Sequence, residues 1–197
     1  MILQAASEQK VSVSVLAIDT IQSDGPPFVG RRAELDRLSE MLAPADRGTS
    51  IAVVTGPPGV GKTALTKQAA MSVHGAGWFT HALFVDMRGY EVDPSNRARR
   101  EDVYLSLLRR LGVRNDDIPA NPGDQGTLYS QIIDQLAADG KPVLLWLDNV
   151  SDSSQFELLR PAGSVHRLVV TTREAFASPT GLSSISMSLT NRKQSNF

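Results

Sequence analysis

The 197-residue chain has no cysteine, only three histidines and no long hydrophobic run. Without cysteine it can form no disulfide, no thiolate metal site and no cysteine nucleophile. His74, His81 and His166 lie too far apart in the sequence to suggest a shared metal site, so we expect them on the surface or satisfied in the core. No apolar stretch approaches the roughly 20 residues that cross a bilayer. We therefore expect a cytoplasmic protein without membrane contact.

The chain also lacks an excess of positive charge. It has 20 lysines and arginines against 21 aspartates and glutamates, a formal net charge of −1. A nucleic-acid-binding domain normally carries a strongly basic face. One basic cluster, Arg97, Arg99 and Arg100, precedes Glu101 and Asp102, which is typical of a solvated loop before a helix. We expect no direct nucleic-acid binding by this segment.

Residues 1–24 are interpreted as an N-terminal leader, strand-like or disordered. Val11, Val13 and Val15 alternate with serines, as in a half-buried strand. The stretch lacks the charged start and cleavage pattern of a signal peptide. Residues 23–27, Ser-Asp-Gly-Pro-Pro, then break the chain. Residues 25–197 are expected to form one domain.

Short β-branched or apolar runs alternate with segments of helical periodicity after the break. The expected strands are residues 51–55, 82–86, 143–147, 167–171 and 184–189. The expected helices lie around residues 35–42, 62–73, 103–111, 128–136 and 156–159. Such alternation implies crossover connections and a parallel sheet covered on both faces. The sequence therefore predicts an α/β fold with five parallel strands.

The strongest motif is a glycine-rich loop between the first of these strands and its helix. Residues 56–63, Gly-Pro-Pro-Gly-Val-Gly-Lys-Thr, match the phosphate-loop pattern G-x-x-x-x-G-K-[ST] in that context. Its backbone N–H groups and the following helix N-terminus can bind phosphate oxygens. Lys62 is expected to reach the β- and γ-phosphates, and the Thr63 hydroxyl to bind Mg²⁺. The alternative is a glycine-rich turn that connects strand and helix and binds no phosphate.

A second candidate site residue ends the most apolar strand. Leu144-Leu145-Trp146-Leu147 runs into Asp148, whose carboxylate is expected at the carboxyl end of the sheet as a second Mg²⁺ contact. Asn149 follows where many related ATPases carry an acid. An amide can hold a water but cannot accept its proton, so we expect slow hydrolysis.

Thr171-Thr172-Arg173 ends the next strand and offers a third candidate. An arginine at that edge can pair with a γ-phosphate. Equally, Thr172 could cap a helix whose solvated start carries Arg173. The sequence alone leaves both interpretations open.

These motifs together resemble the NB-ARC branch of STAND-class P-loop NTPases. The resemblance spans about residues 26–190 and is nearest to the version in actinobacterial transcription regulators of the antibiotic-regulatory type. It rests on 28–31 (FVGR), 56–63, 83–90 (LFVDMRGY), 108–113 (LRRLGV), 144–150, 158–161 (LLRP) and 170–173 (VTTR).

The resemblance implies an AAA+/STAND-like three-layer α/β/α sandwich that binds ATP or ADP with Mg²⁺. The implied site residues are Val29, Gly30 and Arg31 for adenine and ribose; Asp148 and Thr63 for the metal; Lys62, Asp148, Asn149 and Arg173 for catalysis; and, for phosphate binding, Gly56, Pro57, Pro58, Gly59, Val60, Gly61, Lys62, Thr63 and Ala64. Family members act as ATP/ADP switches, and their ATP form can self-associate. The family's helical lid and winged-helix domain should follow residue 190, so we expect the core alone, truncated before the lid.

Two other classes of function remain open at this point. A GTPase would carry Asp-x-x-Gly after its Mg²⁺ strand, whereas Asp148 is followed by Asn149, Val150 and Ser151. A small-molecule kinase would need an arginine-bearing lid, for which only residues 97–100 are available. A non-catalytic interaction domain is the remaining alternative.

Overall fold

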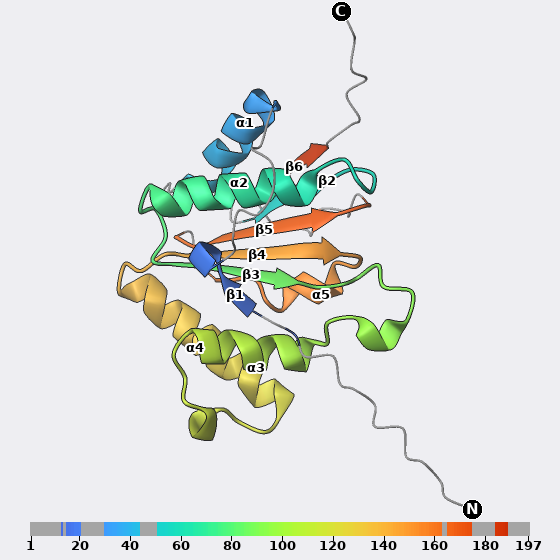
Figure 1. Ribbon diagram of the computed structural model, residues 1–197. Coiled ribbons are helices and arrows are strands. Elements are labelled where there is room, and N and C mark those ends of the chain that lie inside the picture. Colours follow the sequence, from blue (N-terminus) through green and yellow to red (C-terminus); the bar gives the residue numbers. More distant parts are fainter. Residues whose placement is uncertain are drawn as a thin grey trace, which may run out of the picture.

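The computed structural model describes residue 13 and residues 15–20, 30–43, 51–162, 165–174 and 184–188, the last by their backbone alone. Its strands form one sheet in the order β1-β3-β4-β5-β2-β6 (Figure 1). They are β1 (Val15–Ala17), β2 (Ile51–Thr55), β3 (His81–Asp86), β4 (Val143–Val150), β5 (Arg167–Thr172) and β6 (Ser184–Ser188). The last five pair in parallel, which confirms the predicted sheet.

Strand β1 adds an antiparallel edge to this sheet. It pairs with β3 in the register Val15↔Val85, and a 3₁₀ turn, η1 (Ile18–Thr20), follows it. Ser106 Oγ donates to the Val13 carbonyl at 2.9 Å, and Arg110 Nε donates to the Val15 carbonyl at 3.3 Å. This part of the expected leader is thus a strand that packs on the domain.

Helices cover both faces of the sheet (Figure 1). The helices are α1 (Arg32–Leu42), α2 (Lys62–Gly75), α3 (Arg100–Arg110), α4 (Pro122–Ala138) and α5 (Ser154–Glu157), with 3₁₀ turns η2 (Pro94–Asn96) and η3 (Asn115–Asp117). Helices α1 and α2 share one core cluster, and α3, α4 and α5 share the other. None of the helices in the described part of the chain is long and apolar enough to span a membrane.

Strand β4 shows why the sheet requires both layers. Alternate side chains of a strand point to opposite faces. Val143, Leu145 and Leu147 accordingly join the α3/α4 core, whereas Leu144 and Trp146 join the α1/α2 core. All five are at most 1 % exposed. Burial on both faces explains the unbroken apolar run in the sequence.

His166 and Arg167 form buried hydrogen bonds at the amino ends of β4 and β5. The Val143 N–H donates to His166 Nδ1 at 3.0 Å, so Nε2 carries the proton that faces the Ile133 carbonyl at 3.0 Å. Arg167 donates to the Ala43 carbonyl at 2.7 Å, at the end of α1. The expectation of a satisfied core histidine is confirmed at His166, which is 1 % exposed.

The neutral ring of His166 makes stability depend on pH. Burial, first of all, and the nearby Arg167 lower the pKa of His166, against opposing contributions from the Ile133 hydrogen bond and Asp134. The unfolded chain therefore binds more protons than the folded one below about pH 6.5. We expect the free energy of unfolding to fall as the pH drops from 6.5 towards 5, by at most about 1.4 kcal/mol per pH unit from this residue. Urea unfolding of the parent and His166→Gln at pH 7, 6 and 5 measures the contribution. The variant should show a flatter dependence, and equal slopes would contradict the assignment.

Candidate functional site

The glycine-rich loop lies at the carboxyl edge of the parallel strands, between β2 and α2. Gly59 and Gly61 adopt φ angles of 74° and 90°, which residues with a Cβ rarely adopt. Lys62 begins α2, and its side chain turns back over the loop. Its Nζ donates to the carbonyls of Gly56 at 2.8 Å and Pro57 at 2.9 Å. The loop and its lysine therefore form one compact cradle.

Asp148 emerges beside this loop from the end of β4. It is 3 % exposed, and the Thr63 hydroxyl donates to its two oxygens at 3.1 and 3.0 Å. Thr171 Oγ1, from β5, donates to Oδ1 as well. Burial, chiefly, and the neighbouring Asp86 raise the pKa of Asp148, while Thr171, Thr63 and Lys62 act in the opposite direction. The predicted pair Thr63 and Asp148 is thus brought together.

The side-chain amide of Asn149 bridges two carboxylates. Its Nδ2 donates to Asp86 Oδ1 at 3.1 Å and to Asp148 Oδ2 at 3.3 Å. Asp86 and Asp148 are register partners on β3 and β4. Asn149 itself has φ 57°, where the register of β4 against β5 shifts. The amide therefore separates two carboxylates that would otherwise repel each other.

Arg173 lies at the end of β5 and is held by Tyr90. The guanidinium carbon is 4.1 Å from the centre of the Tyr90 ring, and the Arg173 N–H donates to the Tyr90 hydroxyl at 2.7 Å. Burial, first, and the charge of Arg173, second, lower the pKa of Lys62, whereas Asp148 raises it. The register partner of the preceding residue, Thr172, is Thr55, so Arg173 lies next to the start of the phosphate loop. Thr172 Oγ1 accepts from the Glu174 N–H at 3.2 Å, which is a local turn and leaves the helix-cap alternative open.

The expected adenine segment is only partly described. Gly30 and Arg31, with φ 84° and 54°, precede α1, which packs against α2. Val29 lies outside the described residues. The contact of these three residues with a base stays a prediction.

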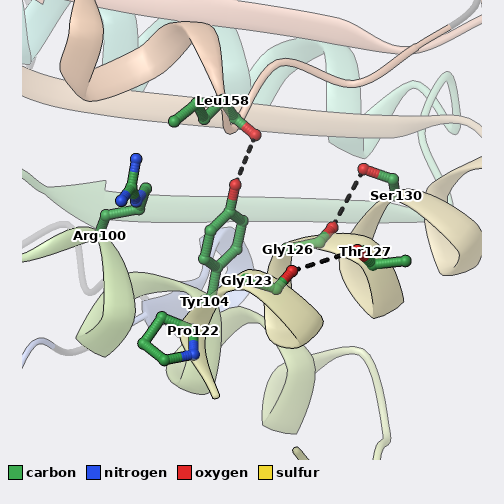
Figure 2. Close-up of a pocket in the computed structure, with 8 residues that line it drawn as sticks. All are labelled: Arg100, Tyr104, Pro122, Gly123, Gly126, Thr127, Ser130 and Leu158. Atoms are coloured by element: carbon green, nitrogen blue, oxygen red, sulfur yellow. Dashed lines mark hydrogen bonds between the residues drawn. The ribbon is translucent and has the colours of Figure 1, made fainter.

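A hollow of about 370 Å³ lies on the α3/α4 side of the sheet. Figure 2 shows Tyr104 crossing it, with its hydroxyl donating to the Leu158 carbonyl at 2.8 Å. The Thr127 and Ser130 hydroxyls donate to the carbonyls of Gly123 and Gly126, one turn earlier in α4. The hydroxyls around this hollow are thus engaged in holding the fold.

Four contact residues were not predicted as site residues: Thr171, Thr172, Asp86 and Tyr90. Thr171 and Thr172 lie in the predicted motif, and alternation along β5 could have directed Thr171 towards Asp148. Asp86, like Asp148, directly follows an apolar run in the sequence, and this pattern could have identified it as a site residue. Tyr90 and Arg173 lie 83 positions apart in the sequence, and no local pattern indicates that they are in contact.

Comparison with known proteins agrees with this geometry. A family model described as an AAA ATPase domain matches residues 27–170. The regulatory proteins AfsR of Streptomyces coelicolor and Streptomyces griseus are each 32 % identical to the chain, over 152 and 149 residues. These matches cover 74 % and 75 % of the chain but only 14 % of each regulator. The crystal structure of Cdc6p from Pyrobaculum aerophilum superposes with a TM-score of 0.56 at 15 % identity, covering 82 % of this chain and 44 % of that one, and shows a shared fold.

The bridging amide of Asn149 generates a stability prediction. Asn149→Asp removes two donors and places a third carboxylate beside Asp86 and Asp148. We expect the free energy of unfolding at pH 7 to fall by about 1–3 kcal/mol. Burial, chiefly, raises the pKa of Asp148, and repulsion from the added charge weakens when this carboxylate takes up a proton, so the deficit should shrink as the pH falls towards 5. Urea unfolding of the parent and the variant at pH 7 and pH 5 measures this loss in the free energy of unfolding.

Asn115→Asp is the matched control. Its side-chain oxygen already accepts from Arg109 Nε at 2.8 Å on the surface, so an added charge should leave stability unchanged or slightly raised. Equal effects of the two substitutions would contradict the bridging role of Asn149.

Proposed function

Because the chain belongs to the AAA ATPase domain family, we propose that it is an adenine-nucleotide switch module of the NB-ARC type. It binds Mg²⁺ with ATP or ADP and hydrolyses ATP slowly. The observation that carries the proposal is the meeting of three groups from α2 and β4. Lys62 and Thr63 are the first two residues of α2, and Lys62 turns back over the phosphate loop. Asp148, near the end of β4, lies within hydrogen-bond distance of Thr63.

The donor set suits the proposed ligand. Backbone N–H groups of a glycine-rich loop followed by a helix N-terminus bind phosphate oxygens, and the ammonium of Lys62 adds positive charge. A hydroxyl and a carboxylate are oxygen ligands of the kind that Mg²⁺ prefers. The bound ion supplies neutralisation of the charge on the phosphates. Thr171 keeps the Asp148 carboxylate oriented towards Thr63.

Slow hydrolysis follows from the residues around Asp148. Asn149 cannot take a proton from water, and its amide is engaged by Asp86 and Asp148. The Arg173 guanidinium is always protonated, so its positive charge can pair with the γ-phosphate and distinguish ATP from ADP. A long-lived ATP state suits a switch better than a turnover enzyme.

The similarity to two regulatory proteins supports a role in signalling or transcription regulation. The chain spans about one seventh of their length, so the output of such a protein is expected to come from other segments. Self-association of the ATP form in a longer parent is part of the same proposal.

Lys62→Ala tests nucleotide binding directly. The substitution removes a charge-assisted contact worth about 2–3 kcal/mol, so the affinity for Mg-ADP and Mg-ATP should fall about 30- to 150-fold. Titration calorimetry measures both constants. The control is Lys141→Ala, which removes a surface lysine paired with Asp139 just before β4 begins, at the opposite edge of the sheet. Unchanged affinity in Lys62→Ala would overturn the proposal.

Asp148→Asn tests the metal contact separately. The amide fills the same space and can still bond to Thr63, but it lacks the charge that attracts a divalent ion. We expect Mg²⁺ to strengthen nucleotide binding in the parent and to have little effect in the variant. Titrations with and without excess chelator compare the two, and equal Mg²⁺ dependence would place the metal elsewhere.

A further inference from the structure

Tyr90 joins the end of β5 through three contacts. Its hydroxyl accepts the Arg173 N–H at 2.7 Å and shares a hydrogen bond of 2.8 Å with Thr172 Oγ1. Its ring lies beneath the Arg173 guanidinium at 4.1 Å. Both the backbone and the head group of Arg173 are therefore attached to the same side chain.

The fold brings Tyr90 there by a close crossing over β4. Tyr90 follows β3, and β4 lies between β3 and β5 in the sheet. The Gly89 N–H donates to the Asn149 carbonyl at 2.8 Å. A Cβ on Gly89 would lie 2.6 Å from that carbonyl oxygen and from the Ser151 nitrogen. Only glycine allows the chain to pass so near the end of β4 and deliver Tyr90 to β5.

The register of the sheet places Arg173 beside the phosphate loop. Thr172 is the register partner of Thr55, the residue directly before Gly56, and Arg173 follows Thr172. Arg173 is exposed, and a free arginine side chain would sample many rotamers in water. The ring and the hydroxyl of Tyr90 restrict that freedom before any ligand arrives.

We propose that Tyr90 is a positioning residue that holds Arg173 towards the γ-phosphate position and thereby raises the preference of the site for ATP over ADP. The inference rests on the function proposed above. Preorganisation of a charged group strengthens only the contacts that this group makes. ADP has no γ-phosphate, so its affinity depends little on where the guanidinium lies, whereas the affinity of ATP depends on it directly.

The test compares Tyr90→Leu and Tyr90→Phe with the parent chain. Titration calorimetry with Mg-ADP and with a non-hydrolysable Mg-ATP analogue gives the ratio of the two affinities. Tyr90→Leu removes the cation–π contact, so the ratio should fall about three- to tenfold towards ADP. Tyr90→Phe keeps the ring and loses the hydroxyl, so a fall of about two- to threefold is expected. Circular dichroism establishes that each variant is folded.

Two controls separate positioning from a structural effect. Tyr104→Phe likewise removes a tyrosine hydroxyl, in this case one on α3 that donates to the Leu158 carbonyl; it should leave the ratio unchanged. In an Arg173→Ala background, either Tyr90 substitution should leave the ratio unchanged, because the group that Tyr90 positions is absent. If Tyr90→Leu fails to fold, Tyr90→Phe in the two backgrounds decides the question.

The outcomes distinguish this inference from the proposed function. A parent that binds neither nucleotide overturns both. A parent that binds both, with Tyr90 variants that weaken ATP and ADP equally or act equally without Arg173, overturns the role of Tyr90 alone. A fall in the ratio that disappears in the Arg173→Ala background supports it.

Discussion

The buried carboxylate of Asp148 is the constraint on which the carboxyl edge of the sheet depends. It is 3 % exposed and accepts hydrogen bonds from Thr63, Thr171 and Asn149. A buried charge without such partners is strongly unfavourable. The hydrogen bonds to Asp148 connect α2, β5 and β4 at one point. The carboxylate that is the candidate metal ligand therefore also fixes the phosphate loop relative to the sheet.

The strand order makes this junction possible. β5 lies between β2, which leads into the phosphate loop, and β4, which carries Asp148. The end of β5 therefore faces both. Thr171 donates to Asp148 and accepts the Asn149 N–H at 3.1 Å. Arg173 follows Thr172, the register partner of Thr55 at the start of the phosphate loop. One strand thus supplies the support for the carboxylate and the arginine beside the loop.

Local features of the site could be predicted from the sequence, and features that join distant segments could not. The loop at residues 56–63 is contiguous, and Asp148 ends an apolar strand, so both are visible in one stretch of sequence. The five parallel strands follow from alternation in the same way. Strand β1 was not separable from a disordered leader, because three residues gain their order from β3, α3 and the core. The bridge from Asn149 to Asp86 depends on a register that only the folded sheet defines.

Asp86 shows how the fold sustains unusual backbone at this edge. Arg88 and Asn149 both have left-handed φ angles, 48° and 57°, which cost energy for residues with a Cβ. One oxygen, Asp86 Oδ1, accepts from the Arg88 N–H at 3.0 Å and from Asn149 Nδ2 at 3.1 Å. The Arg88 turn starts the chain towards Gly89 and Tyr90, and the Asn149 turn ends the straight part of β4. The Asp86 carboxylate therefore stabilises both turns. Because one turn leads to Tyr90, the partner of Arg173, and the other follows Asp148, the positions of Tyr90 and Asp148 depend on the same carboxylate.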